Sequence, residues 1–148
     1  MRDRKRRRPR AVVDTCVLVA GVSAFKPQKK LVTIPSAVLL RGWIDNGNFV
    51  WLLTEDILTE YKAILRHLGV RRRVIGTLIN LVREEAEMVQ VSRSAEISPD
   101  PGDNPFCDCA VEGRADYIFT LNLADFPQEK LRARVIVPGS PLAERRMA

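Results

Sequence analysis

The sequence predicts an α/β domain, a three-layer α/β/α sandwich around a central parallel sheet of about five strands. Two observations predict this class. Short runs rich in β-branched residues alternate along the chain with stretches whose apolar residues recur at helical spacing. The runs are apolar throughout, which is typical of strands covered on both faces. A chain of 148 residues can bury a sizeable core as one domain.

The first elements follow from these patterns. The run at 11–21 begins as a buried central strand and continues, after Asp14, into a loop or helix. Pro35 and Gly47 mark the two ends of a helix, because proline suits a helix start and glycine a helix end. A second buried strand is expected at 49–53.

The remaining elements continue the alternation. Thr54 suits the N-cap of a helix, and a second amphipathic helix is expected over 71–89. A short strand at 89–92 precedes a helix that begins at Phe106 and ends near Gly113. Two last buried strands are expected at 116–121 and 134–138. The three helices before residue 90 are expected to bury Val38, Leu39, Trp43 and Ile44, then Ile57, Tyr61, Ile64, Leu65 and Leu68, then Val74, Leu78, Leu81 and Val82.

The net charge is concentrated at the N-terminus. Residues 2–10 hold seven of the 24 Lys and Arg residues and one of the 18 Asp and Glu residues. The formal charge of +6 therefore belongs to this segment, and the rest of the chain is neutral. We divide the chain into a basic arm over 1–10, expected to be disordered, a domain over 11–139 and a C-terminal tail over 140–148. The arm either attracts phosphate backbones or serves as a solubilising tail, and both interpretations remain open.

Other observations exclude classes of protein. No apolar run reaches the about 18 residues that span a bilayer, so we expect no membrane partner. The apolar stretch after the arm is interrupted by Asp14 and lacks a cleavage site, which argues against a secretory signal. Cys16, Cys107 and Cys109 lack zinc-type spacing. They favour reduced, mostly buried thiols in a cytoplasmic protein.

Acidic side chains gather at one predicted edge of the sheet. Asp14 and Asn122 each follow a predicted parallel strand, and binding sites form beyond the carboxyl ends of such strands. A charge that ends a buried strand carries a desolvation penalty, so Asp14 either caps the next element or binds a cation. Asp103 either caps the next helix or shares its inward face with Phe106 and Ala110.

The other candidates have competing interpretations as well. Glu60 lies at the flank of the apolar stripe of its helix. Either its carboxylate is partly desolvated and needs a cation or donor, or Glu60 is an ordinary residue at the edge of the stripe. Asp108 projects away from the inward face, and we expect it to face solvent. Asp100 serves as an outer partner of the site or as a turn residue. Asn122 and Asp125 offer oxygen ligands from the loop after a strand.

A divalent cation explains why the carboxylates lie together. Mg²⁺ and Mn²⁺ prefer oxygen ligands, and such an ion balances the repulsion among acids. Other chemistry is poorly supported. His67 is the one histidine and suits a helix end or the surface, and we find no glycine-rich phosphate loop, Ser/His/Asp set or Cys/His pair.

Four segments, in the same order as in the family, resemble the PIN domain: VVDTCVLVAG, TEDILTEYKAIL, SPDPGDNPFCDCA and ADYIFTLNLADFP. The resemblance spans about residues 11–139 and is closest to toxins of bacterial and archaeal toxin–antitoxin pairs. It implies a metal-dependent endoribonuclease. It also implies that Asp14, Glu60 and Asp103 are catalytic, ligate Mg²⁺ or Mn²⁺ and position a water for attack on an RNA phosphodiester.

The resemblance also suggests supporting residues and partners. Thr15 matches a small hydroxyl residue that supports the site. Asn122 stands where many members have a fourth acid, which weakens a second metal site unless Asp125 compensates. Single-stranded RNA is the implied substrate, and an antitoxin and a homodimer are the implied protein partners. Basic groups must offset the acids to bind RNA, and the candidates are Arg71, Arg72, Arg73, Lys62 and the arm.

Three hypotheses remain open from the sequence. The chain is a toxin ribonuclease with an antitoxin, an RNA-processing nuclease without one, or a non-catalytic module that binds RNA or protein. Asn122 motivates the third hypothesis, whereas the retained acids Asp14, Glu60 and Asp103 argue against it.

Overall fold

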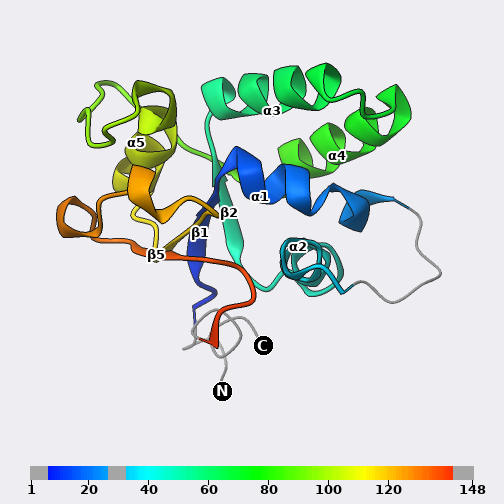
Figure 1. Cartoon of the computed structure of the whole chain (residues 1–148), viewed down its shortest axis with the longest axis horizontal. Coiled ribbons are helices and arrows are strands. Elements are labelled where there is room, and N and C mark those ends of the chain that lie inside the picture. The colour runs from blue at the N-terminus through cyan, green and yellow to red at the C-terminus, as the bar shows by residue number, and fades with distance from the viewer. Residues whose placement is uncertain (1–6, 27–32, 142–148) are drawn as a thin grey trace.

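Five short strands form one sheet in which all neighbouring strands are parallel (Figure 1). The computed structural model describes residues 7–26 and 33–141, so the predictions for residues 1–6 and 142–148 lie outside the described residues. The sheet order is β3–β2–β1–β4–β5, and the predicted fold class is confirmed. The strands are β1 (Arg10–Val13), β2 (Val50–Leu53), β3 (Glu87–Met88), β4 (Tyr117–Phe119) and β5 (Arg134–Ile136).

Helices cover both faces of the sheet. From β1 the chain moves outward to β2 and β3, and it then returns past β1 to β4. Because connections between parallel strands are right-handed, the helix before β4 lies on the other face of the sheet from the helices before it. In Figure 1, α1, α2, α3 and α4 lie on one side of the strands and α5 lies on the other. These helices are α1 (Thr15–Ala20), α2 (Pro35–Asn46), α3 (Glu55–His67), α4 (Arg72–Glu85) and α5 (Asn104–Glu112).

The helix boundaries have local causes that were visible in the sequence. The Thr54 hydroxyl accepts a hydrogen bond from the Ile57 N–H at 3.1 Å and so caps α3. Pro35 opens α2. Gly47 ends it in the left-handed conformation, with φ of 60°. These three predictions are confirmed.

The core lies between the sheet and its helices. The apolar residues of β1 and β2 are fully buried except Val50, as the continuous apolar runs predict. Large aromatic rings fill the space on the side of α2 and α3. Trp43 and Trp51 meet edge to face with ring centroids 4.8 Å apart, and Trp51 packs similarly against Tyr61 at 6.3 Å.

Some predicted core residues lie at the surface. Val38 is 50% exposed and Leu68 is 54% exposed, so both predictions were wrong. In α2 the buried face consists of Ser36, Ala37, Leu40 and Trp43. The backbone at Ser36 approaches Gly21 closely, which turns the small residues of α2 inward. Leu68 lies beyond the last turn of α3, where it is the C-cap.

The third strand and the first strand both begin earlier than predicted. The chain leaves α4 at Glu85, and Glu87–Met88 forms β3 in place of a strand at 89–92. Arg10, which the sequence placed in the basic arm, is the first residue of β1. Its guanidinium binds the Glu87 carboxylate through two hydrogen bonds of 3.0 and 2.6 Å, which joins β1 to β3 across β2.

Candidate active site

Asp14 and Thr120 lie at the point where the direction of the chain through the sheet reverses. From β1 the chain goes on to β2 on one side, whereas β4 lies on the other side of β1 and leads on to β5. Asp14 follows β1, and its N–H donates to the Phe119 carbonyl at the end of β4 at 2.9 Å. Such a reversal leaves a crevice beyond the carboxyl ends of the strands, where ligands bind in open α/β sheets.

The Asp14 carboxylate is held by three donors. It is only 6% exposed. One oxygen accepts the Thr15 N–H at 2.8 Å, so Asp14 does cap α1. The other accepts the Thr120 hydroxyl at 2.7 Å and the Cys16 thiol at 3.1 Å. These neutral donors fix the orientation of the carboxylate and leave its negative charge unbalanced.

Glu60 is tied to the same place by Thr15. The Thr15 hydroxyl donates to Glu60 Oε2 at 2.5 Å, and Glu60 is half-buried on α3, as its flank position predicts. The neighbouring Tyr61 hydroxyl donates to the Val13 carbonyl, which anchors α3 to the end of β1. Burial raises the pKa of Tyr61 well above its usual value, so this hydroxyl remains a donor.

Asp103 belongs to a compact group of three carboxylates. One carboxylate oxygen from each of Asp100, Asp103 and Asp125 lies within 4.8 Å of the others. Asp103 stands at the N-cap position of α5, but its side chain makes no capping hydrogen bond. The Asp100 carboxylate accepts the Gly102 N–H at 3.0 Å. Asn122 donates its amide to Asp125 Oδ2 at 2.5 Å.

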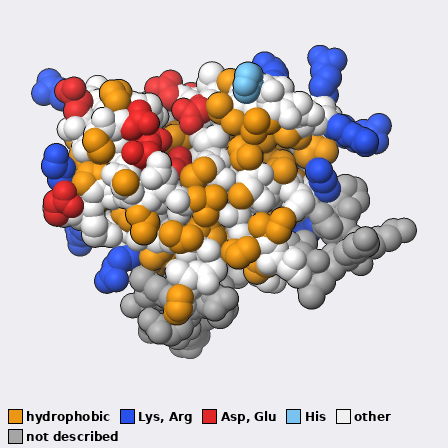
Figure 2. All heavy atoms as spheres, viewed as in Figure 1, with side chains coloured by type: hydrophobic (Ala, Val, Ile, Leu, Met, Phe, Trp, Pro, Cys, Tyr) orange, Lys and Arg blue, Asp and Glu red, His pale blue; other side chains and the backbone are white. Residues whose placement is uncertain are grey.

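The electrostatics connect the two groups of acids. Burial and the facing carboxylate of Asp14 raise the pKa of Asp103 to about 7, and Asp125 and Asp100 add to the effect. The packing agrees with this connection. Tyr61 directly follows Glu60, Phe106 lies three residues after Asp103, and the centroids of the two rings are 6.5 Å apart. Figure 2 shows acidic side chains gathered between α5 and α3 on this face.

A family model of the PIN domain matches residues 10–124. The chain belongs to the PIN domain family. A search of curated proteins found no match to the chain. PIN domains are generally nucleases that typically use divalent metals, and nucleic acid is the substrate that the family suggests.

The donor set of this PIN domain fits a hard divalent cation. The site offers carboxylate oxygens from several chain segments, which Mg²⁺ and Mn²⁺ accept. Within residues 7–26 and 33–141, the ion pairs join Arg10 to Glu87, Arg41 to Asp45 and Arg83 to Glu55, and none reaches these acids. A cation would supply the balancing charge that the described residues do not.

The structure places the predicted arginines away from the acids of the PIN domain. Arg71, Arg72 and Arg73 are exposed at the start of α4, beyond the end of α3. Glu60 lies about 10 Å from that end along the helix axis, at the usual rise per residue. The three arginines line two surface hollows together with Lys26, Lys62 and Arg66.

The prediction that Asp108 faces solvent was wrong, because this residue is only 6% exposed. Its carboxylate accepts the Ala95 N–H at 2.9 Å, so the loop before α5 folds over the outward face of that helix. A helical wheel cannot show that a distant loop covers a face. Asp108 therefore anchors a loop and is not among the clustered acids.

Sequence reasoning missed Thr120. This residue is fully buried, donates to Asp14 and accepts the Asn122 N–H at 3.0 Å. The signal was a hydroxyl residue within the otherwise apolar end of a predicted buried strand. Within the described residues no helix is long and apolar enough to cross a membrane.

Proposed function

We propose that this PIN domain is a metal-dependent endoribonuclease that hydrolyses phosphodiester bonds in single-stranded RNA. One observation carries the proposal: carboxylates converge at the reversal point of the sheet without a basic partner among the described residues. Family membership supports nuclease chemistry, and the crevice position supports a ligand site.

Asp14, Glu60 and Asp103 would hold Mg²⁺ or Mn²⁺, with Asp100 and Asp125 beside Asp103. Such an ion, when bound, supplies positive charge at the scissile phosphate and lowers the pKa of an attacking water. Asn122 carries no charge, and its amide holds Asp125 in the group of acids. This contact supports the idea that Asp125 compensates for a missing fourth acid.

The chain's own residues fix the carboxylates before substrate arrives. Thr120 and the Thr15 N–H hold the two oxygens of Asp14, while the Thr15 hydroxyl holds Glu60. Preorganised groups lose little entropy on binding, which is one way in which proteins make metal and substrate sites effective. Thr15 and Thr120 are therefore positioning residues in this proposal.

The proposed biological role is that of a toxin in a toxin–antitoxin pair, in the cytoplasm, with the antitoxin occluding the acidic crevice. Homodimerisation belongs to the same proposal. An RNA-processing nuclease without an antitoxin would use the same chemistry. A binding module without catalysis is the alternative. It is less well supported, because such a module gains nothing from placing Asp103 where Asp14, Asp125 and Asp100 repel its carboxylate.

Cleavage of end-labelled single-stranded RNA by the purified full chain tests the proposal. We expect cuts in Mn²⁺ or Mg²⁺ that EDTA abolishes and that Asp14→Asn reduces by at least about 100-fold, because a ligand loss exceeds the usual effect of an outer-shell change. Asp45→Asn is the matched control, since Asp45 is exposed on α2, and it should cut like the wild type. Metal-independent cuts, or full activity in Asp14→Asn, would show the proposal to be wrong.

A further inference from the structure

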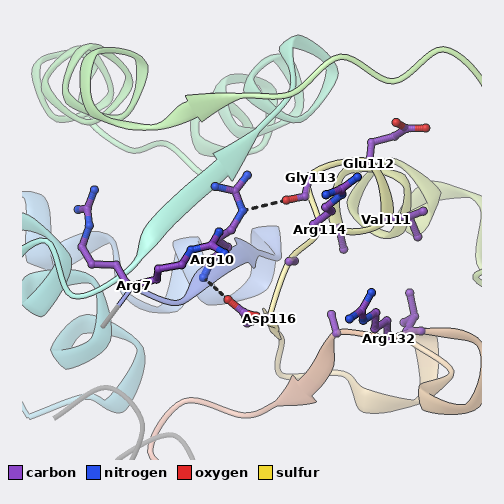
Figure 3. A pocket seen from close by; sticks show the side chains of 13 residues that line it. Arg7, Arg10, Val111, Glu112, Gly113, Arg114, Asp116 and Arg132 are labelled. Atoms are coloured by element: carbon purple, nitrogen blue, oxygen red, sulfur yellow. Dashed lines mark hydrogen bonds between the residues drawn. The ribbon is translucent and has the colours of Figure 1, made fainter. Parts of the chain in front are cut away.

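A second surface feature lies at the opposite edge of the sheet from Asp14. A hollow of about 1150 Å³ opens beside the amino ends of β1, β4 and β5 (Figure 3). Its walls come from three separate parts of the chain: the start of β1, the turn between α5 and β4, and the segment before β5. Five of its lining residues are arginines, namely Arg7, Arg8, Arg10, Arg114 and Arg132.

The lining of this hollow, which we call the arginine pocket, is strongly positive. Among the described residues, the lining has five arginines and two acids, Glu112 and Asp116. Glu87 pairs with Arg10 from outside the lining, which leaves an excess of two positive charges. The Asp116 carboxylate is already engaged, because it accepts the Arg10 N–H at 2.8 Å. Arg7, Arg8 and Arg10 belong to the basic N-terminal segment, so the positive charge of the hollow comes from that segment. The lining residues from the rest of the chain carry two positive and two negative charges.

Two of the arginines are built into the wall. Arg10 is fixed by Glu87, and its Nε donates to the Gly113 carbonyl at 3.0 Å (Figure 3). Arg8 donates to the Gly47 carbonyl at 3.3 Å. The side chains of Arg7, Arg114 and Arg132 make no hydrogen bond or ion pair within the described residues. Three guanidinium groups are therefore available around a rigid wall, and this group binds phosphate through paired donors.

Arg114 occupies a backbone position that disfavours it. Its φ is 53°, in the left-handed region, where a glycine would fit without steric cost. It directly follows Gly113, whose own φ is negative. The backbone of Arg114 is therefore strained, and strained backbone conformations cluster at functional sites.

We propose that the arginine pocket binds the phosphate backbone of single-stranded RNA, with Arg7, Arg114 and Arg132 as its contacts. The choice of RNA over another anion rests on the proposed function. The acids that would cut a phosphodiester lie at the other end of β1, about 13 Å away at the usual strand rise. In this proposal, β1 leads from the arginine pocket, which binds RNA, to Asp14 and the other acids, which cut it. In the sequence, residues 2–6 continue the basic run directly from Arg7.

Binding of a fluorescein-labelled oligouridylate, followed by anisotropy in EDTA, tests the pocket without cleavage. The double variant Arg114→Gln/Arg132→Gln should bind at least about tenfold more weakly than the wild type at about 0.1 M salt. The slope of log K against log salt should shrink by about 1.4, because two phosphate contacts are lost. Arg83→Gln/Arg93→Gln removes the same charge from exposed arginines outside the pocket and should keep the wild-type slope.

A second variant separates binding from folding. Arg114→Gly relieves the left-handed strain, so its melting temperature should not fall, while its RNA affinity should drop about fivefold at about 0.1 M salt. Wild-type RNA affinity and slope in both pocket variants would overturn the proposal. A second result would also overturn it: pocket variants that bind RNA like the wild type but no longer bind a labelled oligoglutamate. That result would assign the pocket to an acidic protein segment. Because no cleavage is measured, these results do not depend on whether the acids catalyse hydrolysis.

Discussion

Asp14 and Thr120 show how two single residues from distant parts of the sequence form one unit. A buried carboxylate is costly unless donors satisfy it. Thr120 supplies one such donor at 2.7 Å, and its own hydroxyl is held by the Asn122 N–H. The geometry of Asp14 thus depends on a residue from the neighbouring strand.

Replacing Thr120 by valine should reduce metal-dependent RNA cleavage by about 10- to 100-fold, which is the usual range for residues that orient a ligand. Valine keeps the shape but removes the donor to Asp14, so we also expect a loss of about 1–3 kcal/mol in unfolding free energy. Urea unfolding and initial cleavage rates measure the two effects.

Two control variants make this prediction specific. Thr120→Ser retains the hydroxyl and should recover most of the cleavage rate. Thr77→Val removes an exposed hydroxyl from α4 and should leave both quantities unchanged. Unchanged cleavage by Thr120→Val would mean that Thr120 only fills space in the core.

Two of the three cysteines, Cys107 and Cys109, act as buried packing residues. Cys107 and Cys109 are fully buried, and burial raises the pKa of each thiol to about 12. Burial also raises the pKa of Cys16, whose thiol donates to Asp14. All three are free thiols, as the spacing in the sequence predicts.

At the scale of elements, the end of α5 is packed against β2 and against Val89, which follows β3, so closely that a Cβ on Gly113 has no room. A Cβ on Gly113 would lie 2.8 Å from the Cys109 carbonyl, 2.9 Å from Leu52 and 3.1 Å from Val89. The Gly113 carbonyl also accepts the Arg10 Nε. One residue therefore sets the distance between α5 and the sheet.

We expect Gly113→Ala to destabilise the protein by about 1–3 kcal/mol, because the last turn of α5 and the side chains of Leu52 and Val89 must shift to admit a methyl group. Gly76→Ala is a matched control, since a Cβ there meets nothing within 4 Å and the residue is exposed in α4. It should instead stabilise by up to about 1 kcal/mol through helix propensity. Thermal or urea unfolding distinguishes the two signs, and equal shifts would contradict the packing explanation.

The elements themselves were largely predictable from the sequence. Thr54, Pro35 and Gly47 mark helix boundaries through local chemistry, and the apolar runs mark strands buried on both faces. The outer surfaces were less predictable. Val38 and Leu68 are exposed because neighbouring elements decide which side of a helix is covered.

The whole molecule separates its charges along the sheet. The clustered acids lie at the carboxyl edge, and the arginine pocket lies at the amino edge. The acids repel one another without a basic partner among the described residues, which is the condition under which a bound cation stabilises a fold.

Adding Mn²⁺ to the metal-free full chain should raise its melting temperature by roughly 5–10 °C when the free Mn²⁺ concentration is about 100 times the dissociation constant. Asp14→Asn should abolish most of this shift, whereas Asp45→Asn should keep it. Scanning calorimetry with and without the metal measures the effect. An unchanged melting temperature in saturating Mn²⁺ would argue against a preformed site.

The sequence by itself determined the fold class, the position of Asp14 at the end of a buried strand and the acidic character of the site. These properties follow from local patterns of apolar and charged residues. Only the tertiary structure decided that Thr120 holds Asp14, that Asp108 lies beneath a loop and that five arginines share one hollow. The physical reason is that these contacts join residues far apart in the chain. A local sequence pattern does not predict which distant elements pack against a segment.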